Sequence, residues 1–341
     1  MVQTRYDSDS GFTLAIEHSS QVGEARRSAT LVAVAGGLNE TDAGKFSILV
    51  TEAATNIAKH AGKGEIMLRA LNGPSTHGAE LVAIDAGPGI GDLDRAFRDG
   101  YSTAGSPGNG LGTFGRLATD FDVFTAQDAG LVLAARIEIP RAGAGQRAFD
   151  VGVVRVPKRG ETACGDDWGA VYHEGGRMTL TVADGLGHGQ AASEASRRAV
   201  EIATENAGES VGGVITQMHA ALRATRGAAV SVAEVDIAAS TVRYAGLGNI
   251  SASILWQQES RSLVSYNGTA GHEMRKIQEF TYDWRPKSLL VMHSDGVSAR
   301  WDLNRYPGLA LHDPSVVAGV IYRDFSRGRD DALVVVVRAG G

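Results

Sequence analysis

Cysteine is nearly absent from this chain of 341 residues, and the single Cys164 excludes an internal disulfide and fits a reducing compartment. Basic residues are not in excess: the formal net charge is −6, which argues against nucleic acid or an anionic membrane as the main partner. No apolar run approaches the roughly 18 residues of a membrane span. The first ten residues also lack the apolar core of a signal peptide. We therefore expect a cytoplasmic protein.

The length is sufficient for two domains with separate cores, and no repeat or low-complexity tract interrupts the chain. A stretch of small residues, Arg141–Arg147, follows an apolar alternation from Leu131 to Ile139 and is the best boundary. This pattern predicts a first domain over residues 10–140 and a second over residues 150–339.

The strongest helical pattern of the first half covers residues 41–62, with Thr41 as the expected N-cap and Gly62 as the expected C-cap. Apolar residues recur there at core spacing. Glu52, Asn56 and Lys59 fall on another face, at spacings of four and three, where a carboxylate, an amide and an ammonium can meet one ligand. A solvated polar face is the other interpretation of these three residues.

Two glycine-rich segments follow this helix. The predicted strand Leu81–Ile84 ends in Asp85, before Ala-Gly-Pro-Gly, and a second glycine-rich run ends at Gly112, where Thr113 can begin a helix. Glycines let backbone amides approach an anion, and a helix N-terminus favours phosphate. The spacing matches neither the P-loop nor the dinucleotide-binding fingerprint.

Three segments in this order, Glu52–Asn56, Asp85–Gly89 and Gly108–Gly112, resemble the ATP-binding boxes of the GHKL superfamily, and Asp99–Thr103 resembles the variant of RsbT-type anti-sigma serine kinases. The resemblance implies that Glu52 orients or deprotonates the attacking hydroxyl, that Asn56 helps to hold Mg²⁺ with ATP, and that Asp85 binds the adenine amino group. Lys59 is either a phosphate contact or a surface residue. The remaining ATP-binding positions that it implies are Gly87, Gly89, Ser102, Thr103, Gly108, Gly110, Leu111 and Gly112.

Acidic residues stand at the ends of apolar segments in the second half. The run Met178–Ala183 stops at Asp184 and gives way to Gly-Leu-Gly-His-Gly, while Asp166 lies in a Gly-Asp turn. Asp295 follows one apolar run, and the pair Asp330 and Asp331 precedes another. If these carboxylates converge, they suit hard cations such as Mg²⁺ or Mn²⁺. Each one alone is equally compatible with a turn or a cap.

Five segments of the second half are similar, in order, to SpoIIE/RsbX-type members of the metal-dependent (PPM) serine/threonine phosphatases: Cys164–Asp166, Ala183–Gly189, Tyr244–Ile250, His293–Gly296 and Arg329–Ala332. The resemblance implies a site for two Mn²⁺ or Mg²⁺ ions that activate a water molecule. In it, Asp184 would be the central catalytic residue and bridge the ions, and the Gly185 carbonyl would add a ligand. Asp295 and Asp330 would complete the ligands of the second ion.

Other residues near these motifs have less certain roles. Asp166 would bind a cation directly or through water, and Asp331 is a neighbour that the resemblance does not rank. His188 either protonates a leaving alkoxide or makes an ordinary hydrogen bond in its turn. Asn249 and Gly248 are expected at the rim that receives the phosphosubstrate, and Cys164 is expected to be structural.

The predicted fold class is α+β with two domains. The first is a GHKL-type α/β sandwich, a mixed sheet with helices on one face, and the second is a PPM-type αββα layered sandwich. The resemblances imply a bifunctional partner-switching protein whose ATP-dependent kinase half and phosphatase half act on a serine or threonine of a STAS-domain partner. Two alternatives remain: an ATP-regulated binding or anti-sigma module without turnover beside an active phosphatase, or an inert phosphatase half that serves as a scaffold.

Overall fold

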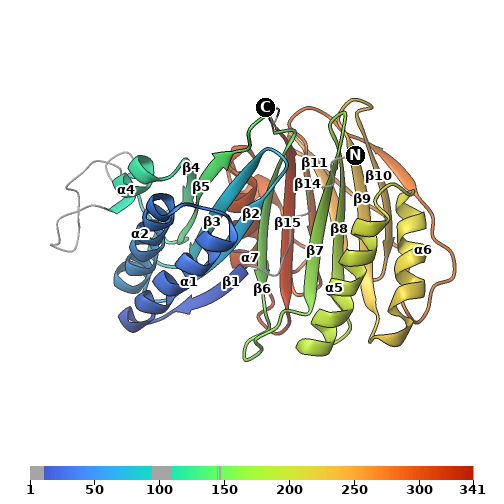
Figure 1. Cartoon of the computed structure of the whole chain (residues 1–341), viewed down its shortest axis with the longest axis horizontal. Helices are drawn as coiled ribbons and strands as arrows, with labels where there is room; N and C mark the ends of the chain where they lie inside the picture. The colour runs from blue at the N-terminus through green and yellow to red at the C-terminus, as the bar shows by residue number, and fades with distance from the viewer. Residues whose placement is uncertain (1–10, 94–109, 144, 146, 341) are drawn as a thin grey trace. The chain divides into compact units, whose positions relative to one another are not determined.

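The computed structural model describes the chain except residues 1–10, 94–109, 144, 146 and 341 (Figure 1). Its contacts divide the described residues into two units. The first unit contains the described residues of Asp9–Gly145 together with Leu311–Arg323, and the second contains those of Gln146–Ala310 and Asp324–Gly341. None of the described helices is long and apolar enough to cross a membrane.

A five-stranded sheet in the order β1-β2-β3-β5-β4 forms the base of the first unit. All of its described pairings are antiparallel, so the predicted mixed sheet is wrong. Strands β2 and β3, for example, are joined by only three residues, whereas a parallel pair needs a long crossover. The strands are β1 (Gly11–Ile16), β2 (Gly64–Asn72), β3 (Thr76–Asp85), β4 (Asp120–Thr125) and β5 (Leu131–Pro140).

Helices α1 (Val22–Ala35) and α2 (Glu40–Asn56) lie across one face of this sheet (Figure 1). The apolar positions of α2 that the sequence placed in the core are buried there, with alternate residues of β3 such as Leu81. Asn39, not the predicted Thr41, is the N-cap of α2, because its side chain accepts the backbone N–H of Asp42 at 2.9 Å. The helix continues as one π-helical turn and ends before Gly62, the predicted C-cap, whose φ is 77°.

The other face of the sheet carries helix α7 (Pro314–Phe325), which comes from far along the chain. A Cβ atom on Gly319 would lie 2.5 Å from Cγ1 of Val132, so the helix backbone rests directly on β5. At the start of α7, the Ser315 hydroxyl donates to Glu80 of β3 at 2.8 Å. The prediction of helices on one face only is therefore wrong.

Replacing Gly319 with alanine is expected to lower the free energy of unfolding by about 1–3 kcal/mol, because a stiff β-branched valine occupies the space that the new methyl group needs. Gly44→Ala in α2 is the matched control: nothing lies within 4 Å of its Cβ position, and alanine should stabilise that helix by up to about 1 kcal/mol. Urea unfolding followed by circular dichroism measures both changes. Equal effects of the two variants would contradict the packing of α7 on β5.

Glu80 is buried under α7 and remains charged. Burial opposes its ionised form, but Arg69 and Arg136 outweigh that effect and lower the pKa of Glu80 to about 2. Because the folded-state pKa lies below the ordinary value of 4.5, the charged form stabilises the fold above about pH 4.5, and this contribution is lost as the pH falls through 2.

We expect Glu80→Gln to remove about 3 kcal/mol of pH-dependent stability between pH 4.5 and 2. Unfolding free energies measured across this range should therefore fall less steeply for the variant than for the wild type. Glu24→Gln, a change at an exposed position of α1, should leave the slope unchanged. Parallel slopes for Glu80→Gln and the wild type would show that the paired carboxylate has no such role.

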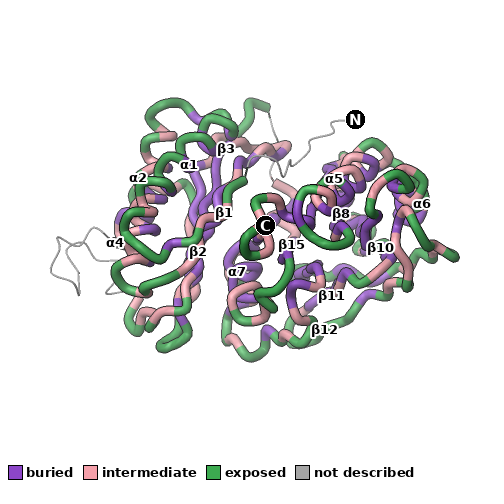
Figure 2. Tube along the Cα trace, turned by 90° about the horizontal axis from the view of Figure 1, so that it is seen from below, coloured by how far each residue is buried: buried purple, intermediate pink, exposed green. Residues whose placement is uncertain are grey.

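The second unit contains two five-stranded sheets, in the orders β13-β10-β9-β8-β7 and β12-β11-β14-β15-β6. Their inward-facing apolar residues form one core, and helices α5 (Gln190–Glu205) and α6 (Val211–Ala221) pack on the outer face of the first sheet. Buried residues accordingly follow the strands in Figure 2, while the helices keep exposed faces. The strands are β6 (Phe149–Val156), β7 (Asp166–His173), β8 (Arg177–Gly185), β9 (Ala228–Asp236), β10 (Thr241–Leu247), β11 (Ser251–Trp256), β12 (Glu259–Ser262), β13 (Phe280–Asp283), β14 (Leu289–His293) and β15 (Ala332–Ala339).

Candidate active sites

Strand pairing gathers the aspartates of the second unit. Asp166 begins β7 and stands opposite Asp184 near the end of β8 in the antiparallel register. Asp295 follows β14, and Asp330 and Asp331 directly precede β15, where the end of β14 pairs with the start of β15. Pairing within one sheet therefore sets Asp166 beside Asp184, and pairing within the other sets the loop of Asp295 beside Asp330 and Asp331.

The electrostatics of these aspartates show that they influence one another. Burial, and then the charges of Asp295 and Asp330, raise the pKa of Asp184 to about 7. Burial, and then the charge of Asp184, raise the pKa of Asp166 well above its ordinary value. Such mutual repulsion is what a positive ion would relieve.

The donor set fits a divalent cation. It consists of carboxylates, the ligands that hard cations prefer, and Oδ2 of Asp331 is buried without a hydrogen-bond partner. Oδ1 of the same residue accepts the backbone N–H of Lys158 at 2.8 Å. No three His, Cys, Asp or Glu side chains among the described residues are close enough to hold one ion as they stand. Ion binding would therefore require carboxylate side chains to turn toward a common point.

Several neighbours orient these carboxylates, and the sequence alone did not identify their roles. Ser294 donates its hydroxyl to Oδ2 of Asp166 at 2.6 Å, and the Asn249 amide donates to Oδ2 of Asp295 at 2.7 Å. Asn249, expected at the substrate rim, is thus a hydrogen-bond partner of a candidate metal ligand. The serine was recognisable only as the neighbour of Asp295 in its motif.

Glycine is required at two positions around Asp184. A Cβ atom on Gly185 would lie 2.1 Å from the backbone oxygen of Ala192, and φ of Gly189 is 74°. His188, in the same turn, places Nδ1 2.7 Å from Oε1 of Glu161. No pattern in the sequence pointed to Glu161. Its carboxylate fixes the orientation of the His188 ring.

In the first unit, Glu52 and Asn56 lie one helical turn apart near the end of α2, and both are half-buried. Lys59 lies in the π-helical turn Ile57–Ala61 and is exposed. The α-helical spacing assumed from Asn56 to Lys59 does not continue through this turn, because a π-turn adds one residue to the hydrogen-bonded repeat. Its contact with ATP stays a prediction.

Asp85 ends β3 and is fixed by its own loop. Its Oδ1 accepts the backbone N–H of Gly87 at 2.8 Å. Burial raises the pKa of this carboxyl, and the Gly87 and Leu131 amides, then Arg323 and His60, act in the opposite direction. Both predicted glycines of the loop are sterically required: a Cβ atom on Gly87 would lie 2.8 Å from Cα of Ala61, and one on Gly89 would lie 2.1 Å from the oxygen of Ala126.

The third predicted ATP-binding segment is described only in part. Ser102, Thr103 and Gly108 lie outside the described residues. Helix α4 (Gly110–Leu117) begins three residues earlier than Thr113, the position at which the sequence analysis placed its start. The side chain of Leu111 is buried in the core, so only its backbone is available to a ligand, and Gly112 lies in the first turn.

A groove of about 830 Å³ runs between α1 and α2 and reaches Glu52. Its apolar lining includes Val34 and Ile48, which are 67% and 49% exposed. Arg26 and Glu40 contribute opposite charges. Large exposed apolar side chains beside a half-buried carboxylate are typical of a surface that receives another protein.

The first unit is similar to known ATPases. The family model of the histidine kinase-like ATPase domain matches residues 17–137. The serine/threonine-protein kinase RsbT of Bacillus subtilis (strain 168) is 32% identical over 111 residues, which cover 33% of this chain and 84% of RsbT. The chain belongs to the RsbT-type ATPase family. Its first half is therefore an ATP-binding domain.

The second half of this RsbT-type protein matches the family model of stage II sporulation protein E (SpoIIE) over residues 174–339. The phosphoserine phosphatase RsbX of the same organism is 26% identical over 148 residues, 43% of this chain and 73% of RsbX. A solved structure from work on the bacterial stressosome, a modular system adapted to control secondary messenger signalling, shares 27% identity with a TM-score of 0.52, and the match covers 56% of this chain and 99% of that one. The chain is thus an enzyme that fuses an RsbT-like half to a SpoIIE-type phosphatase domain of the metal-dependent class.

Proposed function

We propose that the protein phosphorylates and dephosphorylates a serine or threonine of a STAS-domain partner, with the kinase in residues 10–140 and the phosphatase in residues 150–339. The coexistence of two sites carries this proposal: Glu52 at the end of an apolar groove, and Asp184 among the aspartates that raise its pKa to about 7. The similarity to RsbT and RsbX supports opposite activities in one chain. We place this action in the cytoplasm, where the single cysteine, Cys164, would stay a free thiol.

In the phosphatase half, Asp184, Asp295 and Asp330, with Asp166, Asp331 and the Gly185 carbonyl, are the residues that would hold Mg²⁺ or Mn²⁺. Two bound divalent cations supply a nucleophilic water and neutralise phosphoryl oxygens. The chain's own residues prepare the site: Ser294 and Asn249 orient Asp166 and Asp295. In this proposal His188, whose ring contacts Glu161, gives a proton to the departing serine or threonine oxygen.

In the kinase half, Glu52 accepts the proton of the attacking hydroxyl, and Asn56 helps to hold the Mg²⁺ that accompanies ATP. Asp85 receives the adenine amino group, and the Gly87 amide, which donates to its Oδ1, holds the carboxylate in position. Glycines 87, 89, 110 and 112 allow close approach of the nucleotide, and binding and orientation account for most of the rate in this chemistry.

The test is to incubate the purified full chain with a STAS-domain protein and γ-labelled ATP, then to remove ATP and add Mn²⁺. We expect label to enter a serine or threonine of the partner and to be released as phosphate in the second step. If the protein binds ATP but transfers no label to the partner, only the phosphatase part of the proposal would remain. Failure of both steps would overturn the proposal.

Ile48→Asp is expected to lower transfer to the partner by about tenfold or more without changing ATP affinity, because a charge would be buried when the partner covers the groove. Leu31→Asp is the matched control. Leu31 is 60% exposed on the neighbouring helix but does not line the groove. Initial rates of partner phosphorylation measure the effect. Equal rates for the two variants would show that the partner does not dock on this groove.

A further inference from the structure

Helix α7 links, along the chain, the two sites described above. Residues Leu311–Arg323 belong to the first unit, although the chain on either side of them belongs to the second unit. Asp330, a candidate cation ligand, follows Arg323 by only seven residues. Only this short segment of chain therefore separates the end of α7 from the candidate cation site.

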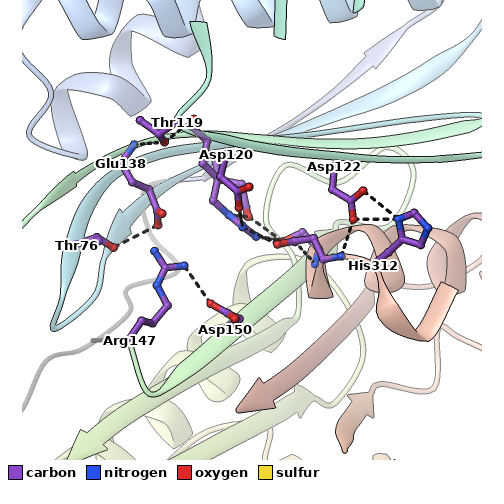
Figure 3. A network of polar contacts seen from close by, with 12 residues as sticks. Thr76, Thr119, Asp120, Asp122, Glu138, Arg147, Asp150 and His312 are labelled. Carbon is purple, nitrogen blue, oxygen red and sulfur yellow. Dashed lines mark hydrogen bonds and ion pairs between the residues drawn. The ribbon is translucent and has the colours of Figure 1, made fainter. Parts of the chain in front are cut away.

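The beginning of this segment is firmly anchored on the ATPase sheet. Asp313 accepts two hydrogen bonds from the guanidinium of Arg136, at 2.6 and 2.7 Å, and Arg136 is only 4% exposed. His312 places Nδ1 3.0 Å from both carboxylate oxygens of Asp122 on β4 (Figure 3). The Ser315 hydroxyl binds Glu80. This end of α7 is thus the fixed end.

The far end of the segment reaches the nucleotide side of the sheet. Gly319 rests on Val132 and Ile84, and Ile84 directly precedes Asp85. One turn later, Tyr322 is hydrogen-bonded to Glu65, whose strand neighbour is Ile84. Burial raises the pKa of Asp85, and the positive charge of Arg323 is among the contributions that oppose this rise. The last turn of α7 therefore lies within electrostatic reach of the Asp85 carboxylate.

Immediately beyond α7, the chain is tied to the loop that follows Asp295. Ser298 donates its backbone N–H to the oxygen of Phe325 at 2.9 Å, and Arg327 donates to the oxygen of Gly296 at 2.8 Å. A Cβ atom on Gly296 would lie 1.8 Å from the oxygen of Asp331. The connection from α7 is thus hydrogen-bonded to the loop that carries Asp295, and this loop packs closely against the backbone of Asp331.

We propose that nucleotide binding at Asp85 and divalent-cation binding at Asp295 and Asp330 are thermodynamically linked through the last turn of α7 and residues 324–331, each increasing the affinity for the other. The proposal rests on the proposed function, since it needs both sites. Because the start of α7 is fixed, each ligand orders one end of the same short connection. The second ligand then meets a smaller ordering cost, and the linkage must be reciprocal.

The first test uses Mn²⁺ alone, without nucleotide, and measures hydrogen exchange of the amides in α7 and in residues 84–87. In the wild type, Mn²⁺ should slow exchange in the last turn of α7 about fivefold or more. Three glycines inserted between Gly328 and Arg329, in an exposed turn, should abolish this slowing while leaving both sets of site residues unchanged. The same insertion between Gly175 and Gly176, in the β7–β8 turn, is the matched control and should behave as the wild type.

The second test measures linkage in the other direction. With free Mn²⁺ held by a metal buffer, saturating ADP should lower the Mn²⁺ concentration for half-maximal hydrolysis of p-nitrophenyl phosphate about fivefold. The insertion after Gly328 should remove this shift but retain ADP binding and hydrolysis. Suppose that the wild type binds ADP and hydrolyses the ester, but that Mn²⁺ does not slow exchange and ADP does not shift the Mn²⁺ requirement, or shifts it in the opposite direction. The linkage is then wrong, and the proposed function stands. An insertion variant that keeps both effects overturns the route through α7, and loss of ADP binding or of hydrolysis in the wild type overturns both proposals.

Discussion

Replacing Asp184 with asparagine is expected to lower Mn²⁺-dependent hydrolysis of p-nitrophenyl phosphate at least about 100-fold. Loss of a residue that only supports a metal ligand costs about 10–100-fold, and Asp184 is proposed to touch the ions directly. The same change should not destabilise the cation-free protein above pH 7. Burial and neighbouring carboxylates already disfavour the charge of Asp184, as its pKa of about 7 shows.

Steady-state rates over a Mn²⁺ titration and thermal unfolding without cations measure the two halves of this prediction. Asp236→Asn is the matched control, because Asp236 ends the adjacent strand β9 and its side chain accepts the backbone N–H of Ala239 in the following turn at 2.8 Å. Its activity should stay within about twofold of the wild type. An Asp184→Asn variant that keeps full activity would remove the aspartate cluster from the mechanism, whereas one that fails to fold would contradict the electrostatic argument.

Glu52→Gln is expected to lower phosphoryl transfer to the partner by about 10²–10⁴-fold, the usual contribution of a general base. ATP affinity should change little, since glutamine preserves the shape of the side chain and Glu52 is proposed to act on the hydroxyl rather than on the nucleotide. Single-turnover transfer of labelled phosphate and fluorescence titration with an ATP analogue measure the two quantities separately.

Glu24→Gln, at an exposed position of α1, is the control for this experiment and should transfer phosphate at the wild-type rate. A Glu52→Gln variant that is equally fast would exclude the base role. A wild type that binds ATP and the partner without any transfer would instead favour the nucleotide-regulated binding module, with the phosphatase half as the active enzyme.

The glycine loop after Asp85 shows why parts of the site are predictable from sequence. Asp85, Gly87 and Gly89 are neighbours in the chain, and the hydrogen bond from Gly87 to Asp85 spans only two residues. The strand-end position of Asp184 was likewise visible, because an apolar run stops there. Local patterns of this kind report local geometry.

Other features depended on distant partners or on small changes of register. The π-helical turn moves Lys59 by a single added residue, for which the sequence carries no distinct pattern. The amide of Asn249 reaches Asp295, 46 residues away, and Asp313 reaches Arg136, 177 residues away. Such pairings are decided by which strands and helices pack side by side.

The sequence by itself determined the two-part α+β organisation, the family resemblances and the residues that carry the proposed chemistry, because these are written in contiguous motifs and in the period of apolar residues. Only the tertiary structure decided that the ATPase sheet is antiparallel and that a segment from the second half covers its other face. That segment is held by a buried arginine and by the fit of Gly319 against Val132. Both depend on complementary surfaces formed after folding, which no local stretch of the chain encodes.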